Sequence, residues 1–213
     1  MIADGFYYAL AAILAGAGLV WLWGWPGWIP AALLAGFFLY FFRDPERRIP
    51  EDPEAVVSPA DGRVSLVETT PAGTRISIFL SIFDVHVNRA PIAGRVSGVD
   101  YRRGKFLNAL NPRCSAENEQ NRVRLEGEQG MVDFAQIAGV LARRIVFWPH
   151  PGDRLQRGER VGLIKFGSRV DLWLPARAEP LVTRGKRVRG GSTILARLPP
   201  APAEPAHNHS QEA

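Results

Sequence analysis

Apolar residues fill the first 42 positions almost without interruption, and Asp4 is the only charged residue among them. The stretch 6–23 would form about 27 Å of helix, close to the hydrocarbon thickness of a bilayer. A second stretch, 29–42, would form only about 21 Å. Tryptophans and prolines between the two stretches combine interfacial rings with helix breaks. The pattern therefore predicts a helical membrane hairpin over residues 1–42.

After residue 42 the apolar positions alternate with a period of two, which is typical of strands. In the segment 75–83, isoleucine and leucine share one face, while serine and phenylalanine share the other. The segments 123–125 and 131–134 flank a glycine-containing turn, and further glycine turns are expected at 152, 158, 167 and 185. No amphipathic helix pattern of 12 or more residues appears there. The sequence predicts a mainly β, sandwich-like or barrel-like domain over residues 43–198, followed by a disordered tail over 199–213.

Apart from Asp4, all charged residues lie in the part of the chain that follows the apolar leader. All 26 Lys and Arg lie after residue 42, against 20 of the 21 acids, so this part carries a net charge of about +6. A basic body behind an apolar leader suits an anionic membrane, whereas nucleic acid is not expected as a partner because the basic residues form no dense run. Arg43, Arg47 and Arg48 follow the second stretch directly. Because cytoplasmic segments next to membrane helices carry an excess of Lys and Arg, these residues predict a body on the cytoplasmic side of the cell membrane.

Three segments carry candidate chemistry. Gly191 and Ser192 lie in the run Arg-Gly-Gly-Ser-Thr, which by itself is a flexible turn before a strand. Asp61 follows Ser-Pro-Ala at an Asp-Gly turn, and His86 lies in the run Asp-Val-His-Val-Asn-Arg. A serine hydroxyl is a weak nucleophile that needs a base, and a histidine oriented by a carboxylate can supply one. Glycines beside the serine would let a backbone carbonyl be approached closely.

Together these segments resemble the short-form phosphatidylserine decarboxylases. The resemblance covers about 43–198 and includes Phe-Arg-Asp-Pro ending at Pro45, Gly-Lys-Phe-Leu-Asn from Gly104, Glu-Asn-Glu from Glu117, and Ile-Lys-Phe-Gly-Ser-Arg-Val-Asp from Ile164. Arg89 stands where longer relatives carry a second histidine.

The resemblance implies a proenzyme that cuts itself between Gly191 and Ser192, leaving a larger chain, 1–191, and a smaller one, 192–213. Ser192 would become a covalent pyruvoyl cofactor, and Asp61 and His86 would belong to the site that activates Ser192 and later moves protons. The substrate would be phosphatidylserine in an anionic membrane, decarboxylated to phosphatidylethanolamine through a Schiff base with the pyruvoyl group. No metal is implied, and both a monomer and a homo-oligomer are compatible with the sequence.

Two other classes of function remain open on sequence. A membrane-anchored serine hydrolase would keep Asp61, His86 and Ser192 as a lasting triad in an uncut chain, although no Gly-x-Ser-x-Gly run surrounds Ser192. A tethered carrier domain of the lipoyl type would need a modifiable lysine at an exposed hairpin tip. Lys165 instead lies within an apolar strand pattern.

Overall fold

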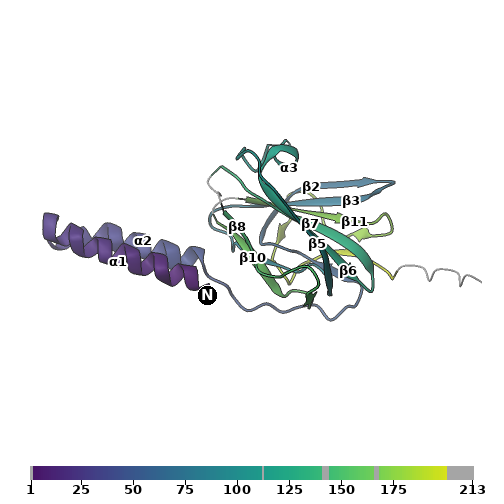
Figure 1. The fold of residues 1–213 in the computed structure, drawn as a ribbon, viewed down its shortest axis with the longest axis horizontal. Helices are drawn as coiled ribbons and strands as arrows, with labels where there is room; N and C mark the ends of the chain where they lie inside the picture. The colour runs from purple at the N-terminus through teal and green to yellow at the C-terminus, as the bar shows by residue number, and fades with distance from the viewer. Residues whose placement is uncertain (1, 112, 141–143, 166–167, 201–213) are drawn as a thin grey trace, which may run out of the picture.

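The protein consists of a helical hairpin that projects from a β body (Figure 1). The structure is a computed structural model, and it describes residues 2–111, 113–140, 144–165 and 168–200. The hairpin contains α1 (Ala3–Trp23), the 3-10 turn η1 (Trp25–Gly27) and α2 (Trp28–Phe41). The two predicted apolar stretches thus form two helices, and the bend lies at the tryptophan and proline cluster.

Small residues form the seam between the two helices. A Cβ atom added to Gly16 would lie 2.6 Å from Cβ of Ala31, and one added to Gly5 would lie 2.7 Å from Cβ of Phe42. Most of the large apolar side chains instead point outwards, as the exposed fractions of Leu14 (66%) and Trp23 (70%) show. A soluble helix pair would bury such side chains, whereas membrane helices pack through small residues. Only α1, among the described helices, is long and apolar enough to cross a membrane.

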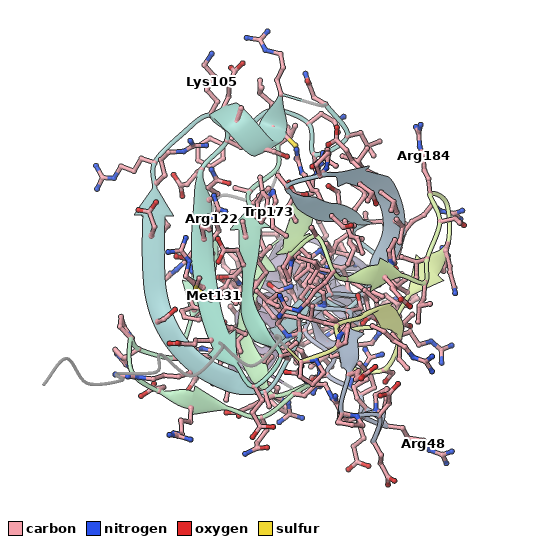
Figure 2. All side chains as sticks on the ribbon, turned by 90° about the vertical axis from the view of Figure 1, so that its right-hand side faces the viewer. Arg48, Lys105, Arg122, Met131, Trp173 and Arg184 are labelled. Atoms are coloured by element: carbon pink, nitrogen blue, oxygen red, sulfur yellow. The ribbon has the colours of Figure 1, made fainter. Side chains whose placement is uncertain are left out.

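The body is built from antiparallel strands in one curled eight-stranded sheet and two three-stranded sheets. The large sheet runs in the order β13 (Arg187–Val188), β2 (Gly62–Thr70), β3 (Gly73–Leu80), β11 (Ser168–Leu174), β7 (Gly130–Ile137), β6 (Gln120–Gly127), β5 (Gly94–Arg102) and β9 (Arg154–Leu155). The small sheets are β1 (Ala55–Val57), β14 (Ile194–Arg197) and β12 (Glu179–Pro180), and β4 (Val87–Arg89), β10 (Arg160–Lys165) and β8 (Arg144–Phe147). Figure 2 shows the large sheet curling around the body.

The mainly β prediction is confirmed. The predicted hairpin forms between β6 and β7, where Val123 pairs with Phe134, and one four-residue helix, α3 (Cys114–Glu117), is described after residue 42. Glycines 152, 158 and 185 have positive φ angles, as expected of turn residues. The glycine turn expected at 167 and residues 201–213 of the predicted tail lie outside the described residues.

The predicted strand 75–83 is wrong at its end, because β3 stops at Leu80. Asp84 terminates it: its Oδ2 accepts hydrogen bonds from the backbone N–H of Ser81 at 2.8 Å and from the Ser81 hydroxyl at 2.7 Å. This local side-chain bond folds residues 81–84 into a turn and leaves Phe83 64% exposed. The alternating pattern could not reveal it, because Ile82 and Phe83 continue the period of two.

A buried ionic cluster lies between β11, β3 and α3. The carboxylate of Asp171 is 2.6 Å from Nε of Arg169 and 2.7 Å from Nη2 of Arg75, and it accepts a hydrogen bond from Ser115 at 2.7 Å. Burial by itself would raise the pKa of Asp171, but the two arginines and the hydrogen bonds hold it below its usual value. Ser115 is the member that belongs to α3, so its hydrogen bonds to Asp171 and Arg75 fix α3 against the sheet.

Candidate active site

Residues 189–193 form a tight turn between β13 and β14. The backbone N–H groups of Ser192 and Thr193 both donate to the carbonyl of Arg189, at 3.1 and 3.0 Å. The N–H of Gly191 donates to the carbonyl of Ser58 at 2.8 Å, and the N–H of Ser58 donates back to the carbonyl of Thr193 at 2.8 Å. The turn is thus tied on both sides to the strand end that leads to Asp61.

Gly191 occupies a conformation that a side chain would obstruct. Its φ angle is +75°, in the left-handed region, and an added Cβ would lie 2.9 Å from Cδ of Arg89 and 3.1 Å from Cδ1 of Ile49. Ser192, the next residue, is half-buried. The carbonyl of Gly191 and the hydroxyl of Ser192 therefore belong to a turn that is constrained by its backbone bonds and by close packing.

Asp61 lies directly against this turn. Its Oδ1 accepts a hydrogen bond from the backbone N–H of Gly190 at 2.8 Å, and Nη2 of Arg47 is 3.0 Å from its carboxylate. Burial raises the pKa of Asp61, while the Gly190 N–H and the Arg47 charge oppose the rise. The carboxylate thus contacts the peptide that joins Arg189 to Gly190, two residues before Ser192.

His86 is buried at the junction between the body and the hairpin, with an exposed fraction of 2%. Its ring centroid lies 4.2 Å from that of Phe41 in α2, and its Nδ1 is 2.9 Å from the carbonyl oxygen of Asp84. Burial is the main cause that lowers the pKa of His86 to about 4, and the Arg43 charge adds to the lowering. This lowering favours the neutral imidazole near pH 7.

The structure places Asp61 against Gly190, in the turn that contains Gly191 and Ser192, and His86 immediately precedes β4, whose Arg89 contacts this turn. Arg89, three residues after His86, packs its side chain against Gly191, and its N–H donates to the carbonyl of Pro59 at 2.9 Å. Among the described hydrogen bonds, Asp61 accepts from Gly190 and Arg47, and Nδ1 of His86 bonds to the carbonyl oxygen of Asp84. The orientation of His86 by Asp61 stays a prediction.

Sequence reasoning missed the part played by the segment that follows α2. The sequence marks Arg47 only as a topology signal, but its side chain is 7% exposed and faces Asp61. Asp44 lies 2.6 Å from Nη2 of Arg89, and Ile49 packs on Gly191. The Phe-Arg-Asp-Pro run marks this segment in the sequence, but no spacing within it indicates what its charges contact.

Lys165 does not have the exposure that a carrier lysine needs. It lies in β10 with a side chain 9% exposed, and its Nζ is 3.2 Å from Oδ2 of Asp4 in α1. This ion pair joins the start of the hairpin to the body, which argues against the lipoyl-type alternative. Among the described residues, no cluster of three or more His, Cys, Asp or Glu could hold a metal.

Two hollows lie on the described surface, and one of them is lined in part by Ile49, which packs on Gly191. One, with a volume of about 650 Å³, lies on β2 and β3 and includes four arginines: Arg63, Arg75, Arg169 and Arg184. The other, of about 790 Å³, lies between β9 and the β6–β7 turn. Neither is lined by Asp61, His86 or Ser192. Gly191 in this turn is packed against Arg89 and Ile49.

The fold and this turn define a mainly β protein with a glycine–serine turn packed beside a buried carboxylate. The model of the family "Phosphatidylserine decarboxylase" matches residues 34–196. A phosphatidylserine decarboxylase proenzyme of Solibacter usitatus is 52% identical over 197 residues, which cover 92% of this chain and 96% of the relative. A proenzyme of the same name from Ruegeria pomeroyi is 45% identical over 205 residues, covering 91% of each chain. The chain belongs to the phosphatidylserine decarboxylase family.

Proposed function

We propose that the protein converts phosphatidylserine to phosphatidylethanolamine with a pyruvoyl group that it makes from Ser192 by cutting its own chain after Gly191. Family membership supports the decarboxylation, and the names of both relatives state that they are proenzymes. The observation that carries the self-cleavage is the turn itself: a left-handed Gly191 precedes Ser192, and Asp61 is bonded to the peptide N–H of Gly190.

In the proposed cleavage, the Ser192 hydroxyl attacks the Gly191 carbonyl carbon, and the acyl group passes from nitrogen to oxygen. A base removes the hydroxyl proton, and the neutral imidazole of His86 is the proposed base. Loss of the α-proton of residue 192 then expels Gly191 as a carboxylate and leaves a dehydroalanine. Addition of water and loss of ammonia convert the dehydroalanine to a ketone at the new N-terminus. The cleavage therefore consumes one water molecule overall.

The surroundings of residue 192 fit such a group. Gly190 and Gly191 have no side chains to shield it, and the hydroxyl of Thr193, the residue that follows, accepts a hydrogen bond from the Arg189 N–H at 2.9 Å. The ketone would supply an electron sink for the two electrons released with CO₂. Asp61 and His86, both largely buried, would exchange protons with the substrate without exposing it to bulk water.

The hairpin explains how such a site would meet a lipid. Arg43 donates to the carbonyl of Phe83 at 2.7 Å, and the ring of Phe41 contacts His86, so the end of α2 is fixed next to the proposed site. If α1 lies in the bilayer, the body is held at the headgroup layer, where the net positive charge of the body favours an anionic leaflet. We propose the cytoplasmic face, because the arginines that follow α2 fit the positive-inside rule.

Mass measurement of the denatured protein tests the cleavage. Wild type should give a fragment ending at Gly191 and a 22-residue fragment with a blocked N-terminus that hydroxylamine traps, whereas Ser192→Ala should stay whole and inactive. Ser97→Ala, on β5 away from the turn, is the matched control and should be cut. A wild type that remains uncut and decarboxylates the lipid would refute the proposal.

Two further variants separate maturation from turnover. If His86 is the base and Asp61 supports it, His86→Ala and Asp61→Asn should both accumulate uncut chain. If His86 acts only on the lipid, His86→Ala should mature, carry the trapped ketone and fail to release CO₂. A His86→Ala protein that is mature and fully active would show that His86 takes part in neither step.

A further inference from the structure

The segment 43–49 leaves α2 in an extended path and has no regular secondary structure. Three of its side chains nevertheless reach three parts of the site. Asp44 binds Arg89 at 2.6 Å, Arg47 binds Asp61 at 3.0 Å, and Ile49 packs against Gly191. We call residues 43–49 the linker strap. A simple tether would need only length and solubility, so these buried contacts require another explanation.

Arg47 is the member of the strap that pairs with the candidate catalytic carboxylate, Asp61. One guanidinium nitrogen, Nη2, lies 3.0 Å from both carboxylate oxygens of Asp61. The two side chains are 7% and 14% exposed, so solvent screens this pair only weakly. Oδ1 of the same carboxylate accepts a hydrogen bond from the Gly190 N–H. A displacement of Asp61 would therefore shift Gly190, the residue before Gly191.

The other charges around Asp61 give Arg47 its importance. Burial is the main cause that disfavours the Asp61 charge, and Asp84, in the turn that follows β3, repels that charge as well. The Gly190 N–H and Arg47 are the two groups that favour the carboxylate. Arg89, the nearby cation of β4, is already engaged by Asp44 and by the carbonyl of Gly158 at 3.0 Å. Loss of Arg47 would leave Asp61 with one favourable partner.

We propose that Arg47 is a positioning residue for self-cleavage, because its ion pair holds the Asp61 carboxylate against the Gly190 N–H. Arg47 thereby couples the turn 189–193 to the linker strap. This inference rests on the proposed cleavage after Gly191. Arg47 touches neither Ser192 nor a substrate, and it acts through Asp61.

The sign of the expected pH effect follows from the charges. Arg47 favours the ionised form of Asp61, so replacing it with a neutral residue raises the pKa of that carboxyl further. Cleavage that needs the carboxylate is then lost at a higher pH than in wild type, as the pH falls. Lysine keeps the charge but cannot place a planar guanidinium, so Arg47→Lys should retain the pH midpoint and recover part of the rate.

The experiment compares Arg47→Gln, Arg47→Lys and Arg48→Gln in the full chain, made by cell-free synthesis with lipid nanodiscs. Arg48→Gln is the matched control, because it makes the same charge change one residue away, and Figure 2 shows Arg48 pointing away from the body. The rate of conversion to the two fragments is followed from pH 5 to 9. Arg47→Gln should slow cleavage about tenfold at pH 7 and move its acidic midpoint up by about one unit, whereas Arg48→Gln should match wild type.

Several outcomes would overturn the inference. Superimposable pH profiles for Arg47→Gln and Arg48→Gln would remove Arg47 from processing. If Arg47→Gln does not fold, as judged by thermal unfolding, Arg47→Lys decides: a shifted midpoint in this charge-conserving variant would contradict the electrostatic role. A wild-type chain that is never cut would refute the proposed function instead, which keeps the two failures distinguishable.

Discussion

Replacement of Phe41 by alanine should change both the stability of the protein and the titration of His86. The Phe41 side chain is fully buried, and its ring lies 4.2 Å from the His86 ring at an interplanar angle of 31°. It packs with Phe42 of the hairpin and Leu163 of β10. Removing a buried phenylalanine leaves a cavity and costs about 3–5 kcal/mol of unfolding free energy.

The effect on His86 follows from the cause of its present pKa. The lowering from 6.5 to about 4 corresponds to roughly 3 kcal/mol in favour of the neutral ring, and burial is its main cause. Water admitted into the cavity would solvate the imidazolium, so the pKa of His86 should rise by about 1–2 units in Phe41→Ala. The nearby Asp84 carbonyl would then favour the cation, with Arg43 opposing it.

The assay is an NMR titration of the imidazole signals in detergent micelles from pH 3.5 to 8, with Phe6→Ala as the control. Phe6 is 58% exposed on α1, so its loss should leave the pKa of His86 unchanged. In wild type, the unfolded chain binds a proton at His86 more readily than the folded chain, so stability falls as the pH drops from about 6.5 to about 4. Phe41→Ala should narrow this window. A pKa that stays at about 4 in Phe41→Ala would refute the assignment of the shift to burial beneath the hairpin.

Two more predictions concern the strap and the turn. A chain that begins at Arg43 keeps Asp44, Arg47 and Ile49 and should still cut itself, although it should be less stable because His86 and Leu163 lose the side chains that cover them. A chain that begins at Pro50 should instead accumulate in the uncut form. Gel analysis of both chains in detergent tests this prediction, and equal cleavage of the two would contradict it. Gly191→Ala should cut about tenfold more slowly, since the left-handed conformation costs alanine roughly 1–2 kcal/mol and its Cβ would press on Arg89. Gly185→Ala, at a φ angle of +93° with open space around it, is the control, and equal cleavage rates in the two variants would contradict the prediction.

The sequence by itself determined the features that depend on local pattern. A run of 42 residues with one charge requires a low-polarity environment, and alternation with a period of two requires strands, so the hairpin and the β class could be predicted without coordinates. Glycine turns were also predictable, because positive φ angles favour glycine. The candidate residues Asp61, His86 and Ser192 came from motifs, and the motifs do not say which side chains meet.

Only the tertiary structure decided which charges pair and what covers the histidine. Arg47 and Arg48 are neighbours of the same type, yet one is buried against Asp61 and the other points away from the body (Figure 2). Phe41 belongs to the apolar hairpin by sequence but packs on His86, 45 positions further along the chain. Local pattern records the secondary structure of a segment, whereas a contact between distant segments depends on how the strands are ordered and where the linker strap crosses them. The physical reason is that burial and charge pairing are properties of the assembled fold, so the pKa shifts of Asp61 and His86 arise only when those segments come together.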